Sequence, residues 1–252
     1  MDKIIILGSS NAVATEDHEN THMVLVGESK TVMVDCVSSP LLRLRKAGID
    51  FHKVTDLILT HFHPDHVSGV PLFLMDMWLL QRRAHLTIHG LDHTLERMEA
   101  VMGFYGWSHW PNFFPVAFER VPERELAQVL ECPDFRVLSS PVRHLVPTIG
   151  IRVESRRSAR VIAYSCDTEP CPEVIRLAGG ADILIHEAAG KGRGHSSAAQ
   201  AGEVAGQAEV SSLVLIHYPT GTPGPGDLVG EAREHFQGKV ALAEDFMELE
   251  LG

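Results

Sequence analysis

Short apolar runs alternate with amphipathic stretches along the chain, and this alternation predicts an α/β fold. Strands are expected at residues 4–7, 23–26, 31–34, 57–60, 137–138, 151–153, 161–164, 183–185 and 213–216. Helices are expected at residues 40–48, 67–83, 92–102, 172–177, 196–208 and 227–236. Because strands alternate with helices, we expect a layered architecture in which helices cover the faces of the sheets.

Individual residues mark several of the expected helix ends. Pro40 has a fixed φ that suits the first turn of a helix. Asp92 is expected to cap the start of its helix and Gly103 to stop it. Ser196 or Ser197 is expected to cap the helix that follows.

Length and composition are those of a folded globular protein. The chain has 252 residues, of which 44% are hydrophobic and 22% charged, so residues 1–252 are expected to form a single domain. No apolar stretch approaches the roughly 18 residues of a membrane helix, and the apolar run near the start is too short for a signal peptide. The four cysteines lack zinc-finger spacing. We therefore expect a cytoplasmic protein with reduced thiols and no membrane partner.

Charge narrows the choice of substrate. The formal net charge of −11 argues against a long nucleic acid held by a broad basic face, but not against a small phosphate ester. The chain also contains 15 histidines. Neutral imidazoles in an acidic chain suggest a metal site, because bound metal ions would offset part of the negative charge.

The segment that follows the expected strand at residues 57–60 carries four potential metal ligands. His61 and His63 point the same way in an extended chain, because side chains alternate with a period of two. Pro64 bends the chain, so that Asp65 and His66 can turn toward a neighbouring position. This arrangement suits two adjacent metals, and imidazole with carboxylate fits Zn²⁺, Mn²⁺ or Fe.

Further polar residues follow other apolar runs. Asp167, His186 and His217 each come after about four apolar residues. Ligands in α/β sheets gather at the carboxyl ends of strands, so these side chains are expected to converge on one rim. Asp35 also follows a strand, and we expect it to support a ligand or cap a turn.

The motif His61-x-His63-x-Asp65-His66 after a strand resembles the signature of the metallo-β-lactamase superfamily. Later segments match further motifs of this superfamily in the same order: residues 141–144 (PVRH), 164–168 (YSCDT), 185–188 (IHEA), 194–197 (GHSS) and 215–218 (LIHY). Together they resemble the phosphodiesterase branch, which includes the tRNA 3′-processing endonucleases and smaller cyclic-phosphate phosphodiesterases. The resemblance implies a four-layer αββα sandwich.

The resemblance also implies the roles of individual residues. One metal would be held by His61, His63 and His144, and a second by Asp65, His66 and His217, with Asp167 bridging the two. The two divalent ions are expected to be Zn²⁺ first, with Mn²⁺ or Fe as alternatives. The implied catalytic residues are Asp65, His195 as proton donor to the leaving group, and Glu187 orienting His195. His186 is given no ligand role.

The resemblance leaves the substrate open. The tRNA-processing enzymes carry a long arm that grips tRNA, whereas only 23 positions separate His144 from Asp167 here. We therefore expect a small-molecule substrate, a small or cyclic phosphate ester hydrolysed through a metal-bound hydroxide, and no long nucleic acid. The alternatives are a thioester or lactone hydrolase, a tRNA 3′-processing endonuclease and a non-catalytic metal-bound accessory protein.

Aromatic residues are concentrated in one segment. Residues 104–118 hold 7 of the 16 aromatic side chains together with two prolines, so a regular helix is not expected there. We expect this segment to pack in the core or to form a contact in a homodimer, in preference to contacting substrate.

Overall fold

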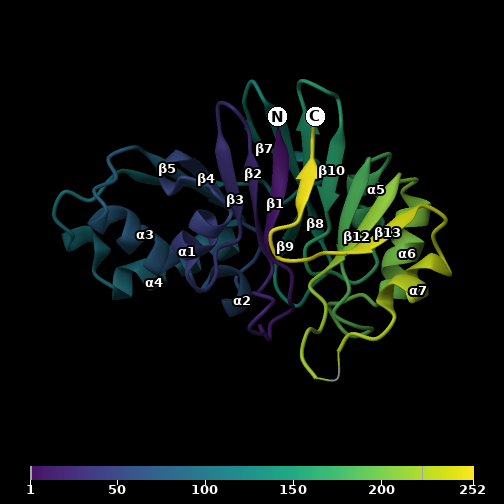
Figure 1. Cartoon of the computed structure of the whole chain (residues 1–252). Coiled ribbons are helices and arrows are strands. Elements are labelled where there is room, and N and C mark those ends of the chain that lie inside the picture. The colour runs from purple at the N-terminus through teal and green to yellow at the C-terminus, as the bar shows by residue number, and fades with distance from the viewer. Residues whose placement is uncertain (1, 223) are drawn as a thin grey trace.

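The computed structural model describes residues 2–222 and 224–252, and its centre is a pair of facing β-sheets (Figure 1). Each sheet has seven strands. The first is ordered β14 (Glu248–Glu250), β1 (Lys3–Gly8), β2 (His22–Val26), β3 (Thr31–Val34), β4 (Val54–Leu59), β5 (Leu86–Gly90) and β6 (Val116–Arg120). The second is ordered β13 (Lys239–Leu242), β12 (Ser212–Ile216), β11 (Ile183–Glu187), β10 (Val161–Tyr164), β9 (Thr148–Ser155), β8 (Phe135–Val142) and β7 (Ala127–Glu131).

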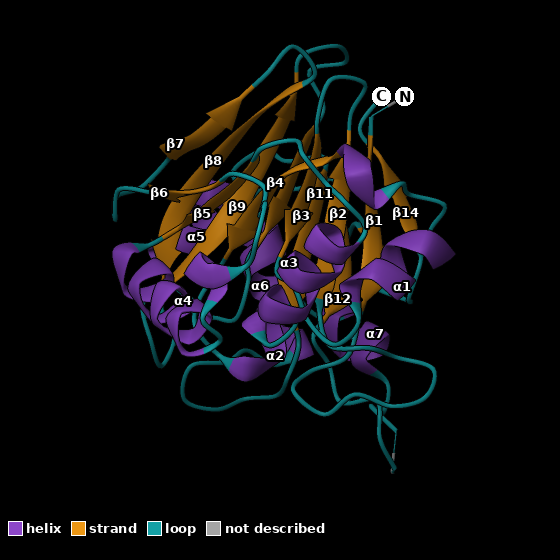
Figure 2. Cartoon of the chain, turned by 90° about the vertical axis from the view of Figure 1, so that its left-hand side faces the viewer, coloured by secondary structure: helices purple, strands orange, loops and turns teal. Residues whose placement is uncertain are grey.

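Helices cover the outer face of each sheet (Figure 2). Those of the first half are α1 (Pro40–Lys46), α2 (Pro64–Val67), α3 (Val70–Leu79) and α4 (Asp92–Phe104), with short 3₁₀ turns at Phe51–Lys53 and Trp107–His109. Those of the second half are α5 (Pro172–Ala178), α6 (Ala198–Gln207) and α7 (Leu228–Arg233).

Three apolar cores separate four layers. Alternation along β1 shows the arrangement, because Ile4 and Ile6 face the core between the sheets, while Ile5 and Leu7 face the core beneath α1, α3 and α4. A third core lies between the second sheet and α5 to α7. The predicted four-layer αββα sandwich is confirmed.

The strand directions bring one set of strand ends to a common edge. Strands β3 to β6 are parallel to one another, as are β10 to β13. The short helix α2, which directly follows β4, lies at the lower edge in Figure 1. The two termini lie side by side at the opposite edge, where the Asp2 N–H donates to the Gly252 carbonyl over 3.1 Å.

The helix predicted at residues 67–83 is wrong in its length, because the structure divides this region into α2 and α3. The break falls at Ser68 and Gly69. A Cβ on Gly69 would lie 2.7 Å from the backbone of Val37, so this position needs glycine, and α3 begins anew with Pro71 in its first turn.

Two other expectations differ in detail. Asp92 is the first residue of α4 and not its cap, which is Leu91, and the helix continues through Gly103 to Phe104. Ser197 caps α6 as predicted, in a reciprocal pair with Gln200. The sequence pattern did not predict β5, β6, β7, β13 and β14, which are short and mostly lie toward the sheet edges.

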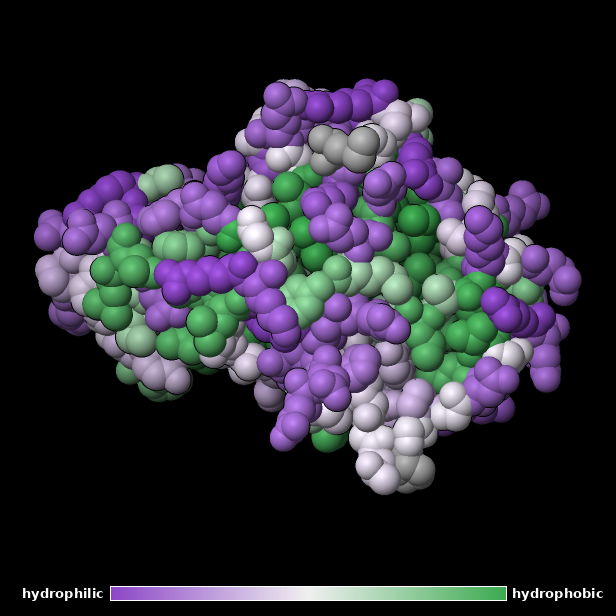
Figure 3. Space-filling model, viewed as in Figure 1, coloured by the Kyte–Doolittle hydropathy of each residue, from purple (hydrophilic) through white to green (hydrophobic). Residues whose placement is uncertain are grey.

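The aromatic segment at residues 104–118 forms no regular helix after α4, as expected. Phe114 is buried, and Trp110 stacks on Trp78 with ring centroids 4.9 Å apart. Phe104 and Tyr105 are instead exposed, by 90% and 62%. Figure 3 shows hydrophobic residues on the surface on the left of the molecule, where α1, α3 and α4 lie. Core packing therefore explains most of the segment, and a homodimer contact stays a prediction.

The described residues include no helix with the length and apolar character needed to cross a bilayer.

Candidate metal centre

The side chains predicted as metal ligands meet at the carboxyl ends of β4, β8, β10 and β12. His61, His63 and His144 form one group in which the candidate ligand atoms all lie within 4.8 Å of one another. Nδ1 of His63 is 3.0 Å from Nε2 of His61 and 3.2 Å from Nε2 of His144. A tetrahedral ion about 2.0–2.1 Å from each nitrogen would require separations of about 3.3 Å, so the group fits a metal such as Zn²⁺.

A second group contains Asp65, His66 and His217. Oδ2 of Asp65 is 3.6 Å from Nε2 of His66 and 4.0 Å from Nε2 of His217. Oδ2 of Asp167 is 3.5 Å from Nε2 of His66 and 3.3 Å from Nε2 of His217. It is also 3.9 Å from Nε2 of His144, so Asp167 occupies the position between the two groups that a bridging ligand requires.

Two buried atoms at this centre lack partners. Among the described residues, Nε2 of His66 and Oδ1 of Asp167 are buried and form no hydrogen bond. Burying polar atoms without partners costs free energy, and a metal ion would supply the missing interaction. The donor set therefore fits divalent metal ions. Two further groupings, His61–His66–Cys166 and His144–Asp167–His195, overlap the same centre.

The remaining ring nitrogens of several histidines are held by fixed partners. Nδ1 of His144 donates to the Gly194 carbonyl over 2.6 Å, and Nδ1 of His66 donates to Asp35 Oδ2 over 2.7 Å. Each contact assigns the proton to Nδ1 and leaves Nε2 free as a ligand. Such partners orient ligand histidines and increase their basicity.

The backbone is strained at this centre. Asp35, Cys166 and His217 follow β3, β10 and β12, and their φ angles are 61°, 54° and 53°. The left-handed region is unfavourable for residues other than glycine, and such strain persists where the surroundings enforce it. The left-handed conformation at each of these residues turns the chain sharply at the end of the strand, so that the side chains of Asp35 and His217 reach the centre.

Burial favours the neutral imidazole at most of these histidines, but at His66 the neighbouring Asp167 and Asp35 outweigh burial and raise the pKa well above its ordinary value. Burial lowers the pKa of His217 to about 4 and holds the pKa of His61 well below its ordinary value. Burial opposes ionisation of Asp167, but the neighbouring His217 and His66 hold the pKa of that carboxyl well below its usual range. Neutral imidazole and ionised carboxylate are the forms that bind metals.

His195 and Glu187 form a pair beside the metal centre. Nδ1 of His195 is 2.9 Å from Oε1 of Glu187. The buried carboxylate of Glu187 also accepts the N–H groups of Thr168 and Ala189, over 3.0 and 2.9 Å. The hydrogen bond to Glu187 raises the pKa of His195. Its ring lies 4.9 Å from that of His144 and 5.9 Å from that of His217, centroid to centroid.

The chain matches known proteins in sequence and fold. Residues 30–218 match the family model described as "Beta-lactamase superfamily domain". This range covers most of the chain and includes both ligand groups. The chain belongs to the metallo-β-lactamase superfamily.

Relatives of this superfamily resemble the whole chain. Ribonuclease Z of Methanothermobacter thermautotrophicus is 29% identical over 306 aligned positions, which cover 100% of this chain and 97% of the relative. The alignment is longer than the 252 residues present here, so that relative carries segments this chain lacks.

Two solved structures share the fold. The metallo-β-lactamase fold protein YhfI from Bacillus subtilis has a TM-score of 0.82 at 20% identity, with 98% of each chain covered. The short form of human tRNase Z has a TM-score of 0.79 at 23% identity, with 100% of each covered. The expected class is confirmed: the chain is a metallo-β-lactamase fold hydrolase that depends on divalent metal ions.

His186 lies on the other face of its strand from the metal centre. It alternates with Glu187 along β11, on the side of Leu184, which belongs to the core beneath α5 to α7. Its Nδ1 contacts the Glu187 carbonyl over 2.8 Å. The His186 side chain therefore points toward the core beneath α5 to α7 and away from the candidate ligands.

The sequence patterns indicate no role at the site for Glu169, Lys191 and Thr21. The Glu169 carboxylate accepts the Gly194 N–H over 2.8 Å and so helps to fix the loop before His195. Thr21 Oγ1 lies 3.3 Å from His217 Nδ1. No motif marks these residues, because their roles arise from contacts between segments distant in sequence.

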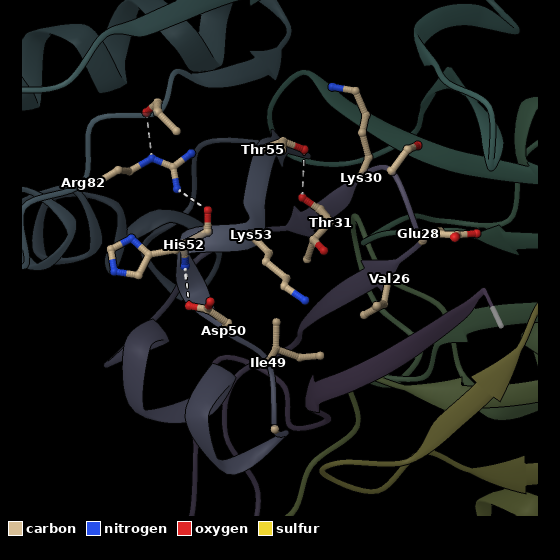
Figure 4. Close-up of a pocket in the computed structure, with 14 residues that line it drawn as sticks. Val26, Glu28, Lys30, Thr31, Ile49, Asp50, His52, Lys53, Thr55 and Arg82 are labelled. Atoms are coloured by element: carbon tan, nitrogen blue, oxygen red, sulfur yellow. Dashed lines mark hydrogen bonds between the residues drawn. The ribbon is translucent and has the colours of Figure 1, made fainter.

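A cavity of about 600 Å³ lies at the starts of β3 and β4, whereas the metal centre lies at the other ends of these strands (Figure 4). Two of its three cationic side chains have partners among the described residues. Lys30 pairs with Asp56, and the Arg82 guanidinium donates to the carbonyls of His52 and Ala84. The ammonium of Lys53, which also lines the cavity, forms no ion pair or hydrogen bond among the described residues.

The β9–β10 hairpin region carries four arginines, and three of them pair with carboxylates, whereas Arg160 forms no ion pair among the described residues. Arg152 bonds to Glu154, Arg156 to Glu131, and Arg157 to Asp134. The hairpin tip lies at the starts of β10 and β11, away from the metal centre, so the cluster does not meet a phosphate there.

Proposed function

We propose that the chain is a binuclear-metal phosphodiesterase, with Zn²⁺ as the first candidate, and that its substrate is an RNA cleaved as in tRNA 3′ processing. The observation that carries the proposal is the pairing of His195 with a buried Glu187 beside two adjacent ligand groups. A relative named ribonuclease Z, aligned over the whole chain, supports RNA as the substrate.

This proposal revises the expectation of a small-molecule substrate without long nucleic acid. That expectation depended on the net charge of −11 and on the absence of a tRNA-gripping arm. Relatives named ribonuclease Z conflict with it. Net charge is a weak guide here, because bound metal ions would supply positive charge that lysine and arginine do not encode.

In the proposed reaction, residues of this chain move two protons. Bound divalent ions would polarise the phosphate and supply a reactive water at neutral pH. The attacking water adds its oxygen to phosphorus and gives a proton to the partly exposed carboxylate of Asp65. The bond from phosphorus to the leaving oxygen breaks, and that oxygen takes its proton from Nε2 of His195. Glu187 accepts a hydrogen bond from Nδ1 of His195 and keeps the ring in this orientation.

The first test removes one ligand. We expect His63→Ala to lower hydrolysis of bis(p-nitrophenyl) phosphate by at least a hundredfold and to reduce the metal content, because its Nδ1 lies near two other ligand nitrogens. His109→Ala changes an exposed histidine outside the centre and should retain activity. Full turnover by His63→Ala would contradict the site.

A second candidate, hydrolysis of a small or cyclic phosphate ester, is favoured by the compact β8–β10 region. Residues 145–166 are mostly β9, β10 and tight turns, so no arm is present there. Comparison of a precursor tRNA with a cyclic nucleotide under the same metal conditions separates the two. Turnover of the cyclic nucleotide alone would favour the second candidate.

A further inference from the structure

A hollow of about 470 Å³ opens beside His195 and is lined by Glu169, Pro170, Lys191, Gly192, His195 and Gln200. None of the candidate metal ligands lines it. If His195 protonates the leaving oxygen, the rest of the leaving group must lie within a few ångströms of this imidazole. The hollow is the adjacent space of suitable size.

Hydrogen bonds pre-form this hollow. The Glu169 N–H donates to the Arg143 carbonyl over 2.8 Å, and Glu169 Oε1 accepts from Gly194 N–H over 2.8 Å. The His195 N–H donates to the Gly192 carbonyl over 3.3 Å. Glycine suits position 194, where φ is +81°. The loop before His195 and the segment of Glu169 are therefore held as one frame.

Three polar groups of the frame remain available to a ligand. Within the described part of the chain, the ammonium of Lys191 forms neither an ion pair nor a hydrogen bond, and Oε2 of Glu169 accepts no hydrogen bond. Gln200 uses Oε1 to accept from Ser197 N–H, so its side-chain amide N–H groups stay free. Lys191 suits a phosphate, whereas the carboxylate of Glu169 suits a hydroxyl donor.

Cations without a carboxylate partner lie close to the proposed acid along the chain. Many other cations pair with carboxylates, as in Arg120–Asp92 and Arg176–Glu125. Arg143 and Arg193, which are exposed and close in sequence to His144 and His195, pair with none among the described residues. Lys191 also lacks a carboxylate partner among the described residues, and its side chain lines the hollow.

We propose that this hollow is the leaving-group subsite and that it binds a nucleoside 5′-phosphate unit, a role that rests on the proposed function of His195. The 2′- and 3′-hydroxyls lie toward His195 and Glu169, and the 5′-phosphate lies toward Lys191. A ligand that carries both a diol and a phosphate satisfies the carboxylate and the ammonium together. The subsite therefore selects RNA over DNA at the leaving nucleotide.

Direct binding tests this subsite without requiring turnover. Calorimetry would compare adenosine 5′-monophosphate, adenosine and 2′,3′-dideoxyadenosine 5′-monophosphate on the metal-loaded protein. We expect Lys191→Ala to weaken binding of the monophosphate about tenfold, as for one charge-assisted contact, and to leave adenosine unaffected. Lys191→Arg should retain the affinity. Lys239→Ala, which alters another exposed lysine without an ion pair among the described residues, should match the wild type.

The proposed contact between the ribose hydroxyls and Glu169 is tested by comparing the ribonucleotide with its dideoxy analogue. Wild-type protein should bind the dideoxy monophosphate several-fold more weakly than the ribonucleotide, and Glu169→Gln should reduce that difference. Monophosphate binding that disappears on chelation but ignores Lys191→Ala would place the phosphate on the metals and overturn the subsite. Equal losses in Lys191→Ala and Lys239→Ala would also overturn it. If the protein hydrolyses no phosphodiester while binding remains dependent on Lys191, the proposed function and the leaving-group role fail, and binding of the nucleoside monophosphate in the hollow stands.

Discussion

At the scale of single residues, the acid role of His195 depends on its partner Glu187. The contact of 2.9 Å raises the pKa of His195, so the imidazolium persists at higher pH than in a free histidine. Hydrolysis of an ester with a poor leaving group should decline as pH rises through this raised pKa, because the proton donor is lost.

Replacing either residue should separate chemistry from binding. We expect His195→Ala to slow esters with poor leaving groups by roughly 10²–10⁴-fold, but activated aryl esters much less, since the latter depart without protonation. Glu187→Gln should move the basic limb of the pH–rate profile to lower pH, because it removes the carboxylate that stabilises the imidazolium. Measured kcat over a pH series with both substrates checks this, and equal losses on both would argue against an acid.

At the scale of elements, replacing glycine by alanine is expected to have opposite effects on stability at two helical positions. A Cβ on Gly202 of α6 would lie 2.4 Å from the Ala232 carbonyl oxygen of α7, whereas a Cβ on Gly103 of α4 meets nothing within 4 Å. Gly202→Ala should lower the free energy of unfolding by about 1–3 kcal/mol through overpacking. Gly103→Ala should raise it by about 0.5–1 kcal/mol, because alanine favours the helix. Urea unfolding of both variants measures the contrast, and similar shifts would contradict the close approach of α6 and α7.

The burial of the strands explains why the sequence pattern predicts some of them and not others. Strands β1, β4 and β12 each contain a continuous apolar run that is buried on both faces, so the pattern reveals them. Strands β6 and β13 have exposed positions and lie at sheet edges, where their pairing with neighbours decides the conformation. The break between α2 and α3 likewise depends on the close approach of Gly69 to Val37, two segments distant in sequence.

At the scale of the whole molecule, the metal centre should join the two halves. Its candidate ligands follow β4 of the first sheet and β8, β10 and β12 of the second. Ions bound there would stabilise the native state by mass action, by about 2.7 kcal/mol at a free concentration of 100 times the Kd. Chelation should therefore lower the melting temperature by roughly 5–10 °C for a chain of this size.

The same ligand variant provides the control for that measurement. His63→Ala should show a smaller drop on chelation than the wild type, because its first ligand group is incomplete. His109→Ala should respond like the wild type. A melting temperature unaffected by chelators in the metal-loaded wild type would contradict a centre that spans both sheets.

The sequence by itself determined the layered α/β class, the dense motif from His61 to His66 and the rule that polar residues gather at the ends of buried strands. These features are local, because periodicity and neighbouring residues encode them. The family resemblance already implied that Asp167 bridges two metals, but only the tertiary structure gave the distances that place it between the two ligand groups. Only the tertiary structure decided that His186 faces away from the centre and that Glu169 and Lys191 line one hollow with His195. Those relations depend on strand pairing and chain reversal between segments distant in sequence, which no local pattern specifies.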